Sequence, residues 1–315
     1  MNILFIADPL ASFKIYKDTT FAMMREAQKR GHQLFVCEPH HLVWQSGQTV
    51  NAQVQQVHLT GHPDAWFEVH GVHADRALHG FDAVVMRKDP PFDSEYFYAT
   101  HLLEQAEREG AKVFNKPSAL RDHPEKLAIL EFAQFISPTL VTRDAQAIRA
   151  FHAVHRDIIL KPLDGMGGMG IFRVKDDALN LGAIIETLNR DGTQTVMVQK
   201  FLPAIAQGDK RVLVIGGKAV PFCLARIPQG GEVRGNLAAG GKGVAQAISA
   251  RDQEIADAIG PVLAARGLLL IGLDVIGDNL TEINVTSPTC FQEIFDQTGC
   301  NVAGLFMDAL ERAAA

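Results

Sequence analysis

Residues 270–289, LIGLDVIGDNLTEINVTSPT, predict two strands joined by a short turn and carrying oxygen ligands. An apolar run with Asp274 leads into Gly-Asp-Asn, and the chain returns with Glu282 and Asn284. Because side chains in a strand alternate between two faces, Glu282 and Asn284 share a face. Carboxylate and amide oxygens on rigid strands suit Mg²⁺, which leaves its remaining positions to water and substrate phosphates. A hairpin whose acids only face water is the alternative on this stretch alone.

The register of this hairpin is a sharper prediction. A strict two-residue turn at 278–279 would set Val275 opposite Glu282 and leave Asp274 on the wrong face. Asp274 can share metal ions with Glu282 and Asn284 only if the loop has an odd length or a strand contains a bulge. We therefore expect one of these two irregularities.

Composition bounds the class of protein. A chain of 315 residues with 47% hydrophobic residues can bury more than one core, so two or three domains are expected. A net charge of -6 argues against a general nucleic-acid or membrane surface. We find no signal-peptide pattern and no apolar run long enough to span a bilayer. The four cysteines form no CxxC pair, which indicates reduced thiols in a cytoplasmic protein.

The first third of the chain alternates between apolar strands and helices. This βαβ pattern predicts a parallel sheet with helices on both faces and ligands beyond the carboxyl ends of its strands. Those ends carry Asp8, Arg87, Lys88 and Asn115. The first loop, DPLASFKIYKD, has no glycine, which argues against a dinucleotide fingerprint. We expect strands at 3–7, 34–37, 83–87 and 112–115, and helices at 20–30 and 94–109.

The segment 48–80 is rich in Gln and His. His58 and His62 are four residues apart, but Gly61 and Pro63 disfavour the helix that would bring both to one face. A solvated surface hairpin is therefore favoured over a metal site. The histidines of this segment are His58, His62, His70, His73 and His79.

A glycine loop follows in DGMGGMGIFRV, with four glycines within positions 165–170. A strand on each side excludes a Walker A loop, which needs a following helix and a Lys-Ser/Thr pair. Backbone N–H groups of such a loop can approach triphosphate oxygens closely, because no Cβ intervenes. Lys161 before the loop, and Lys126 on an expected helix at 124–135, would neutralise phosphate charge. A tight hairpin needing positive φ values is the alternative.

The remainder predicts a compact α+β unit and then a mostly antiparallel region. Its first unit ends in a strand at 195–201, whose exposed backbone groups can pair with an adenine edge, although by itself this stretch favours an ordinary strand end. The expected elements are strands at 139–142, 157–161, 170–174, 195–201, 210–215 and 220–227, and helices at 179–189, 252–266 and 302–312.

The longest glycine-rich stretch is IPQGGEVRGNLAAGGKG, residues 227–243. Long loops without secondary structure tend to be lids or linkers. Arg226 precedes this loop, and Arg234 and Asn236 lie within it. The loop could close over a phosphorylated intermediate and exclude water. A flexible linker is the weaker interpretation, because the flanking strands suit one sheet.

Passages along the whole chain resemble the bacterial glutathione synthetases of the ATP-grasp superfamily. The most specific are RKDPPFD and TEINVTSPT, and the supporting ones are FKIYKDTTFAMMREAQKRG, NKPSALRDHPEKL, DIILKPLDGMGGMGIFRV, FLPAIAQGDKRVLVIGG and CLARIPQGGEVRGNLAAGGKG. The resemblance implies an α/β ATP-grasp architecture in three parts. They are an N-terminal Rossmann-like substrate domain at 1–122, a central α+β lid at 123–202, and a C-terminal antiparallel α+β domain at 203–315.

The resemblance also implies a role for each matching residue. For ATP these are Lys126, Lys161, Gly165, Gly167, Gly168, Gln199, Lys200, Leu202 and Asp209, and for the Mg²⁺ ions Asp274, Glu282 and Asn284. Arg211, Arg226, Arg234 and Asn236 would contact the γ-phosphate and the reacting carboxylate. For γ-glutamylcysteine and the acceptor they are Lys17, Asp18, Arg87, Lys88, Ser287, Pro288 and Thr289.

The implied reaction is the ATP-dependent joining of γ-glutamylcysteine and glycine through an acyl phosphate, with Mg²⁺, or Mn²⁺ in its place, and in a homo-oligomer that is a dimer or tetramer. No protein nucleophile is required, and Cys290 has no evident activator in the sequence. Two rivals stay open. One is another carboxylate–amine ligase, which would lack RKDPPFD, and the other is a nucleotide-binding regulator, which would lack the acid, acid, amide set.

Overall fold

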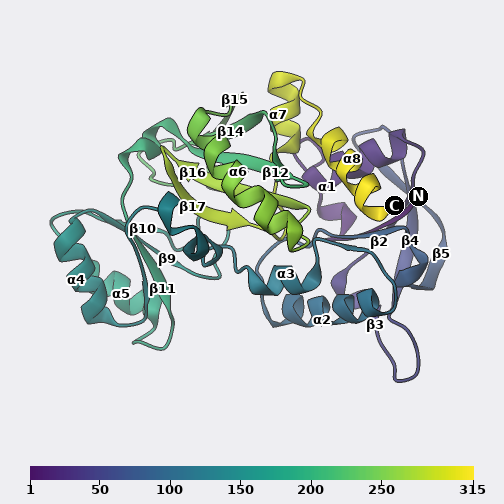
Figure 1. The fold of residues 1–315 in the computed structure, drawn as a ribbon, viewed down its shortest axis with the longest axis horizontal. Coiled ribbons are helices and arrows are strands. Elements are labelled where there is room, and N and C mark those ends of the chain that lie inside the picture. The colour runs from purple at the N-terminus through teal and green to yellow at the C-terminus, as the bar shows by residue number, and fades with distance from the viewer.

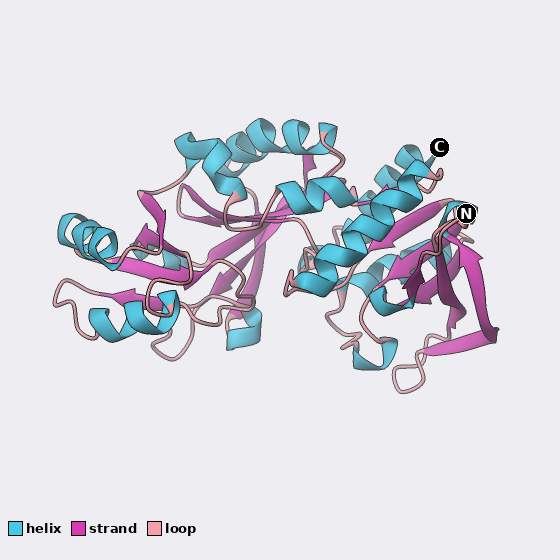
Figure 2. Cartoon of the chain, turned by 90° about the horizontal axis from the view of Figure 1, so that it is seen from below, coloured by secondary structure: helices cyan, strands magenta, loops and turns pink.

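The computed structural model describes all 315 residues except the side chains of Val72 and His73. Its strands form three sheets that lie one after another along the long axis of the molecule (Figure 1). The sheet of residues 139–200 lies at one end, the sheet of residues 2–114 at the other, and the third sheet between them. Both termini lie at the same end, as Figure 2 also shows from below.

The first sheet has seven strands: β1 (Asn2–Ile6), β2 (Gln33–Cys37), β3 (Leu42–Val43), β4 (Asn51–Leu59), β5 (Phe67–Ala77), β6 (Ala83–Met86) and β7 (Val113–Phe114). Neighbours β2, β1, β6 and β7 are parallel as expected. β4 pairs antiparallel with β2, β3 and β5, so the sheet is mixed, with antiparallel strands added beside its parallel centre. The added strands come from the segment 48–80, which forms the β4–β5 hairpin, and a short connection makes the two strands of a hairpin antiparallel to each other.

This hairpin, β4 and β5, has the solvated character that its composition predicts. His58, His62, His70 and His79 are exposed, and the rings of His58 and His70 lie 5.9 Å apart across the two strands. Among the described residues, no three His, Cys, Asp or Glu side chains group as a metal site. The side chain of His73 lies outside the described residues.

Four helices cover the first sheet: α1 (Thr19–Lys29), α2 (Ser94–Arg108), α3 (Pro117–Asp122) and, from the far end of the chain, α8 (Val302–Ala314). α1 begins after Asp18, whose carboxylate accepts a hydrogen bond from Phe21 N at 2.7 Å and caps the helix. α8 packs on α1, and Arg30 joins the two through Asp308 at 2.7 Å and Glu311 at 3.2 Å. The C-terminal helix therefore completes the N-terminal layer.

The second sheet is antiparallel in the order β10-β9-β11-β8. Its elements are β8 (Thr139–Thr142), α4 (Ala145–His155), β9 (Ile158–Pro162), β10 (Phe172–Val174), α5 (Leu181–Asn189) and β11 (Val196–Lys200). The glycine loop is the β9–β10 connection, as predicted. α4 was not predicted, because only Ile148 and His152 of its residues are buried and the apolar pattern is thin.

The expected helix at 124–135 is only partly present. Residues Ala128–Phe135 form a 3-10 helix kinked at Phe132, and Lys126 lies in the turn before it. The backbone oxygen of Glu125 accepts a hydrogen bond from Ile283 N at 3.0 Å. Because this turn is bonded to a distant strand, its backbone cannot continue the helical pattern.

The third sheet is antiparallel in the order β15-β14-β12-β16-β17, with β13 paired to β12. Its elements are β12 (Asp209–Ile215), β13 (Lys218–Ala219), β14 (Phe222–Ile227), β15 (Lys242–Ala247), α6 (Ala250–Ala265), β16 (Leu270–Ile276), β17 (Asn279–Asn284) and α7 (Phe291–Thr298). α6 lies across the sheet in Figure 1. Further 3-10 turns are Leu10–Ser12, Pro39–His41, Leu78–Gly80, Pro203–Gln207 and Leu237–Ala239.

The apolar core is shared unequally among the sheets. One large cluster of buried side chains joins the first and third sheets. It includes Leu4 and Val84 from the first sheet and Val212 and Leu273 from the third. The second sheet has a separate cluster, made chiefly with α4 and α5. The first and third sheets therefore form one body, and the second sheet carries its own core. None of the described helices is long and apolar enough to cross a bilayer.

Candidate active site

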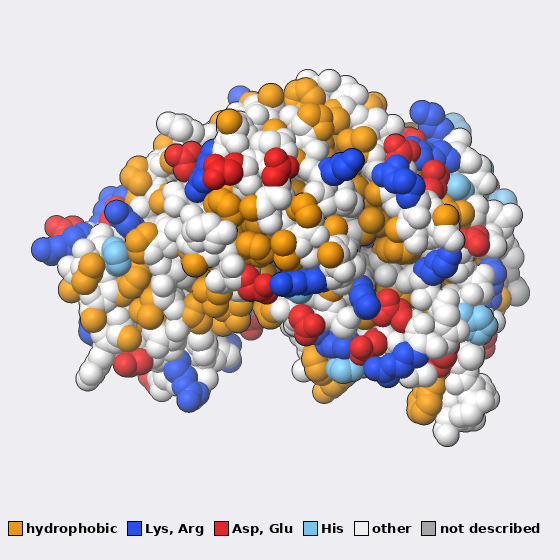
Figure 3. Space-filling model, in the orientation of Figure 1, with side chains coloured by type: hydrophobic (Ala, Val, Ile, Leu, Met, Phe, Trp, Pro, Cys, Tyr) orange, Lys and Arg blue, Asp and Glu red, His pale blue; other side chains and the backbone are white. Residues whose placement is uncertain are grey.

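One cavity of about 470 Å³ is lined by strands of the second and third sheets and by α1 and loops beside the first sheet. Figure 3 shows the outline hollowed between the two lower lobes of the molecule, those of α4 and α5 and of α2 and α3. All but two of the site residues expected from sequence line this cavity. They are Lys17, Asp18, Arg87, Lys126, Lys161, Gly165, Gly167, Gly168, Gln199, Lys200, Leu202, Asp209, Arg211, Arg226, Arg234, Asn236, Asp274, Glu282, Asn284, Ser287 and Thr289.

The two exceptions are Lys88 and Pro288. Lys88 Nζ turns to Asp8 Oδ1, with which it forms an ion pair at 2.7 Å. The backbone oxygen of Pro288 accepts a hydrogen bond from Arg87 Nη2 at 3.1 Å. Lys88 is therefore neutralised within the first sheet, and Pro288 acts on the cavity through Arg87.

The β16–β17 hairpin has the irregularity that the sequence requires. Asp274 pairs with Glu282 and Gly272 with Asn284, whereas Val275 pairs with Leu280, so the register shifts by one residue between Asp274 and Val275. The extra residue is Thr281, whose hydroxyl donates to Asp274 O at 3.1 Å. The bulge brings Asp274, Glu282 and Asn284 to one face, which confirms the predicted register.

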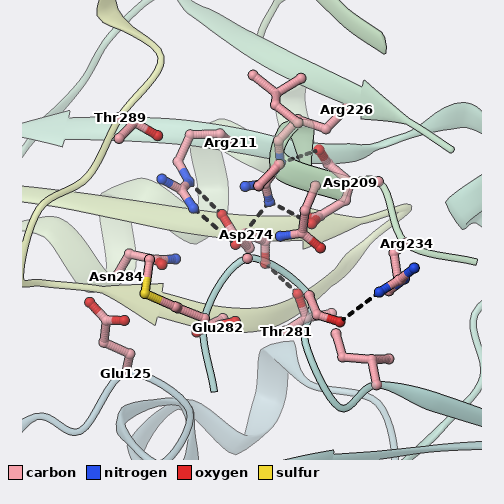
Figure 4. Close-up of a pocket in the computed structure, with 18 of the residues that line it drawn as sticks. Glu125, Asp209, Arg211, Arg226, Arg234, Asp274, Thr281, Glu282, Asn284 and Thr289 are labelled. Carbon is pink, nitrogen blue, oxygen red and sulfur yellow. Dashed lines mark hydrogen bonds and ion pairs between the residues drawn. The ribbon is translucent and has the colours of Figure 1, made fainter. Parts of the chain in front are cut away.

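Two arginines converge on Asp274 from neighbouring strands (Figure 4). Arg211 Nε and Nη2 donate to its two oxygens at 2.6 and 3.2 Å, and Arg226 Nη2 lies 2.9 Å from Oδ2. Arg226 Nη2 also donates to Asp209 Oδ2 at 2.5 Å. The register places these side chains together, because Arg211 faces Asp274 and Arg226 faces Asp209 across their strand pairs.

Burial and mutual charge set the protonation of this cluster. Burial would raise the pKa of Asp274, but Arg211 and Arg226 outweigh it and hold that pKa well below its usual range. Burial raises the pKa of Asp209 to about 6, and Asp274 adds to the rise while Arg226 opposes it. Asp209 Oδ1 is also buried without a hydrogen-bond partner. Asp274 is therefore ionised at neutral pH. Asp209 is the carboxyl group of the cluster whose pKa lies closest to neutral pH.

Two buried lysines lie beside the glycine loop. Lys126 Nζ donates to Gly165 O at 2.6 Å and lies 3.4 Å from Glu282 Oε1. Lys161 Nζ donates to Thr281 O at 3.2 Å. Burial lowers the pKa of Lys161, which Glu282 partly offsets. Lys126 is therefore shared between the glycine loop and Glu282, whereas Lys161 has no carboxylate partner among the described ion pairs.

The end of β11 forms an apolar slot of the kind that a base can enter. Gln199, Lys200 and Leu202 line it, with Ile159 and Ile276 on facing strands. Gln199 is held by its amide, which donates to Thr139 Oγ1 at 3.2 Å. The sequence around 199–202 did not predict Ile159 and Ile276 as lining residues, because the two isoleucines belong to other strands.

The long glycine-rich loop between β14 and β15 packs on the first glycine loop. Arg234 Nη1 donates to Gly168 O at 3.4 Å. A Cβ built on Gly168 would lie 2.7 Å from Asn236 Oδ1, and the φ of Gly168 is +84°. Only glycine allows this close approach of the two loops. The loop at 227–243 therefore lies where a cover over the cavity would have to lie.

A second polar group lies at the other end of the cavity. Arg87 is buried, and its Nε donates to Thr20 Oγ1 at 3.1 Å. Burial lowers the pKa of Arg87, although Asp89 and Asp18 oppose the change. No described carboxylate forms an ion pair with this guanidinium. Asp89 is bonded instead to Ser287 Oγ.

Sequence reasoning missed several residues that line the cavity. The polar ones are Ser12, Lys14, Thr19, Thr20, Asp89, Glu125, Ser137, Thr281, Thr286 and Glu293. Asp89 lies within RKDPPFD, and Glu125 directly precedes Lys126, so proximity to predicted residues was the available signal. Cys290 also lines the cavity, and burial raises the pKa of its thiol. No described histidine lines the cavity.

The donor set of the β16–β17 hairpin fits a hard divalent cation. Glu282 and Asn284 line the cavity on the face of Asp274, and Asn284 Nδ2 donates to Gly272 O at 3.3 Å. That bond fixes the amide and leaves its carbonyl oxygen as the remaining ligand atom. Oxygen donors and few constraints on the remaining positions are what Mg²⁺ requires.

Family models match nearly the whole chain. A model described as the N-terminal domain of prokaryotic glutathione synthetase matches residues 1–121, and one described as its ATP-grasp domain matches residues 125–299. The chain belongs to the prokaryotic glutathione synthetase family. It is therefore an ATP-grasp ligase, and ligases of this kind bind ATP with Mg²⁺.

Curated members of the glutathione synthetase family align along their full length. The glutathione synthetase of Ralstonia nicotianae is 63% identical over 314 residues, covering 100% of this chain and 96% of the relative. That of Nitrosomonas europaea is 58% identical over 315 residues, covering 99% and 98%.

Solved structures agree on the fold. D-cycloserine synthetase DcsG superposes with a TM-score of 0.67 at 16% identity, covering 99% of this chain and 100% of that one. The ATP-grasp ligase PsnB, complexed with a phosphomimetic precursor variant, Mg and ADP, gives 0.62 at 23% identity, covering 100% and 99%. At these identities the likeness concerns the ATP-grasp fold alone.

Proposed function

We propose that this chain joins γ-glutamylcysteine to glycine at the expense of ATP, through an acyl phosphate on the cysteinyl carboxylate. Membership of the family supports the overall reaction. The observation that carries the proposal is that this cavity gathers a glycine loop with two lysines, an oxygen-ligand hairpin and a buried arginine with no ion-pair partner among the described residues. These parts match a triphosphate, a metal and a carboxylate substrate.

At the nucleotide end, Lys126 and Lys161 hold the phosphates against the glycine loop, and the slot of Gln199, Lys200 and Leu202 takes the base. Asp209 borders the ribose. Hydrogen bonds from charged donors to phosphate are short and strong, so the ammonium groups fix the position of the triphosphate. The covering loop with Arg234 and Asn236 excludes water, which would otherwise hydrolyse an acyl phosphate.

At the reacting centre, Arg211 and Arg226 face the phosphoryl group and the carboxylate it joins. Asp274, Glu282 and Asn284 would hold Mg²⁺, which when bound neutralises phosphate charge and aligns the phosphoryl oxygens. The side chains need only align the reactants and stabilise charge, because phosphoryl transfer and amine attack require no protein nucleophile.

At the substrate end, Arg87 binds a carboxylate of γ-glutamylcysteine, with Lys17 and Asp18 beside it. Ser287 and Thr289 border the acceptor. Lys88 and Pro288 act indirectly, through Asp8 and Arg87. The domain limits 1–122, 123–202 and 203–315, the cytoplasmic location and the homo-oligomer stay predictions.

Phosphate release tests the reaction. ATP and Mg²⁺ alone should release little phosphate, γ-glutamylcysteine should add a small amount, and glycine should bring full turnover with one phosphate per glutathione. Lys161→Met should abolish turnover, whereas Lys218→Met, at an exposed lysine of β13, should not. Release that is independent of both substrates would contradict the proposal, and turnover only with another amine would indicate another carboxylate–amine ligase.

A further inference from the structure

Glu125 occupies a place that no role in the reaction accounts for. It lies in the turn between α3 and the 3-10 helix, directly before Lys126, and it lines the cavity. In Figure 4 its carboxylate points toward Asn284 on β17. No described lysine, arginine or histidine forms an ion pair with it.

One oxygen of this carboxylate accepts three hydrogen bonds from the chain that leaves β17. Oε1 takes Val285 N at 3.0 Å, Thr286 N at 3.1 Å and Thr286 Oγ1 at 2.7 Å. The backbone adds a fourth link, because Ile283 N donates to Glu125 O at 3.0 Å. Glu125 is thus bonded to β17 and its exit by both side chain and main chain.

These bonds join two groups of cavity residues that are far apart in sequence. On one side is Lys126, whose ammonium reaches Gly165 O at 2.6 Å and Glu282 Oε1 at 3.4 Å. On the other side are the strand of Glu282 and Asn284 and the turn that leads to Ser287. The direction of the Lys126 side chain depends on where its backbone sits, and Glu125 fixes that backbone to β17.

The electrostatics favour acceptor capacity over charge as the property that matters. Burial raises the pKa of Glu125, and the nearby charge of Glu282 raises it further. A carboxylate kept for its charge would gain from a cation, and this one has none in contact. Three donors on one oxygen, by contrast, need a strong acceptor at a fixed distance from the backbone.

We propose that Glu125 is a positioning residue that fixes Lys126 relative to the metal-binding strand by accepting hydrogen bonds from Val285 and Thr286. The inference rests on the proposed nucleotide site, because its consequence is the placement of an ammonium group against the ATP phosphates. It assigns Glu125 no contact with the reacting atoms.

Two substitutions separate acceptor capacity from charge. Glu125→Gln keeps an acceptor oxygen at the same reach and removes the charge, whereas Glu125→Asp keeps the charge and withdraws the acceptor by one methylene. Matched controls are Glu131→Gln and Glu131→Asp, at an acid of the adjoining 3-10 helix that pairs with Arg266 outside the cavity. The readout is the equilibrium Kd for ATP with Mg²⁺, measured without peptide substrate.

Glu125→Asp should raise the Kd and the KM for ATP about tenfold, the loss expected for disrupted buried hydrogen bonds, and should change the KM for γ-glutamylcysteine less than about twofold. Glu125→Gln should recover most of that loss and stay within about threefold of the unaltered protein. Equal KM changes for both substrates in Glu125→Asp would indicate a general structural defect and overturn the proposal.

A Glu125→Gln protein that binds ATP no better than Glu125→Asp would also overturn it, because charge would then be the property required. If Glu125→Asp does not fold, Glu125→Gln decides: a loss under about threefold supports the proposal, and tenfold or more contradicts it. Failure of the unaltered protein to bind ATP would contradict the proposed function instead.

Discussion

The arginines at the two ends of the cavity are balanced in opposite ways. Arg211 and Arg226 are buried against Asp274, and despite the cost of burial the carboxylate charges raise their pKa values. Arg87 is equally buried, yet its partners are the neutral oxygens of Thr20 and Pro288, and burial lowers its pKa. An ion pair compensates burial at one end, and only neutral hydrogen bonds do so at the other.

The difference indicates two modes of ligand recognition. An unpaired buried guanidinium gains most from a carboxylate ligand, which supplies the missing charge. Arg211 and Arg226 can contact a phosphate in two ways. Either each guanidinium binds the phosphate while it keeps its bond to Asp274, or a cation takes the place of the arginines at the Asp274 carboxylate. Arg87 is thus ready for substrate, whereas the Asp274 cluster changes partners on binding.

The largest expected effect is on stability, from Asp274→Ala. Removing the shared carboxylate leaves Arg211 and Arg226 buried without their main counter-ion, which should cost about 3–5 kcal/mol of unfolding free energy as well as turnover. Denaturant unfolding measures the loss, with Asp278→Ala in the exposed turn of the same hairpin as control. A loss below about 1 kcal/mol would mean that the arginines find other partners.

Arg87→Met should give the opposite pattern, with a large binding defect and little change in stability. The KM for γ-glutamylcysteine should rise about 100-fold, the equivalent of a lost charge-assisted contact, while the Kd for ATP stays within about twofold. Unfolding free energy should change by less than about 2 kcal/mol, since only neutral partners are left. Arg25→Met, on the exposed side of α1, is the control, and comparable defects for both ligands would remove the distinction between the two ends.

The pH dependence of stability should reveal Asp209. Its pKa is raised to about 6, so the stability it contributes is fully present below the usual value of 3.8 and is lost as pH rises through 6. From pH 5 to pH 7 the unaltered protein should therefore lose about 1 kcal/mol relative to Asp209→Asn. Asp274, with a lowered pKa, stays ionised across this window. Parallel stability curves for the two proteins would show that Asp209 does not titrate there.

Thr20→Val should produce the smallest effect. It removes the acceptor of Arg87 Nε with little change in shape, at a cost of about 1 kcal/mol. The KM for γ-glutamylcysteine should rise about threefold to fivefold, and the KM for ATP should not follow. Thr187→Val, at an exposed threonine of α5, is the control. A larger effect on ATP than on the dipeptide would argue against Arg87 as a substrate ligand.

Local chemistry made much of the cavity predictable. Glycines within 165–170, the lysines before them, and the Asp274, Glu282 and Asn284 set are recognisable from residue type and strand spacing. Even the irregular register could be required in advance, because alternation brings Asp274 to the face of Glu282 only through an odd-length loop or a bulge, and the structure decided for the bulge. Where the segment 48–80 lies was not predictable, since a hairpin joins whichever sheet edge it meets.

The sequence by itself determined which chemical groups this protein has and the strands and loops that carry them. Only the tertiary structure decided their partners: that Arg211 and Arg226 share Asp274, that Thr281 is the bulged residue, and that Glu125 is bonded to Val285 and Thr286. Residues 211 and 274 lie 63 positions apart, and they meet through the register of β12 and β16. Register and burial arise from packing of the whole chain, and the same two properties fix which buried charge is paired and which is left for a ligand.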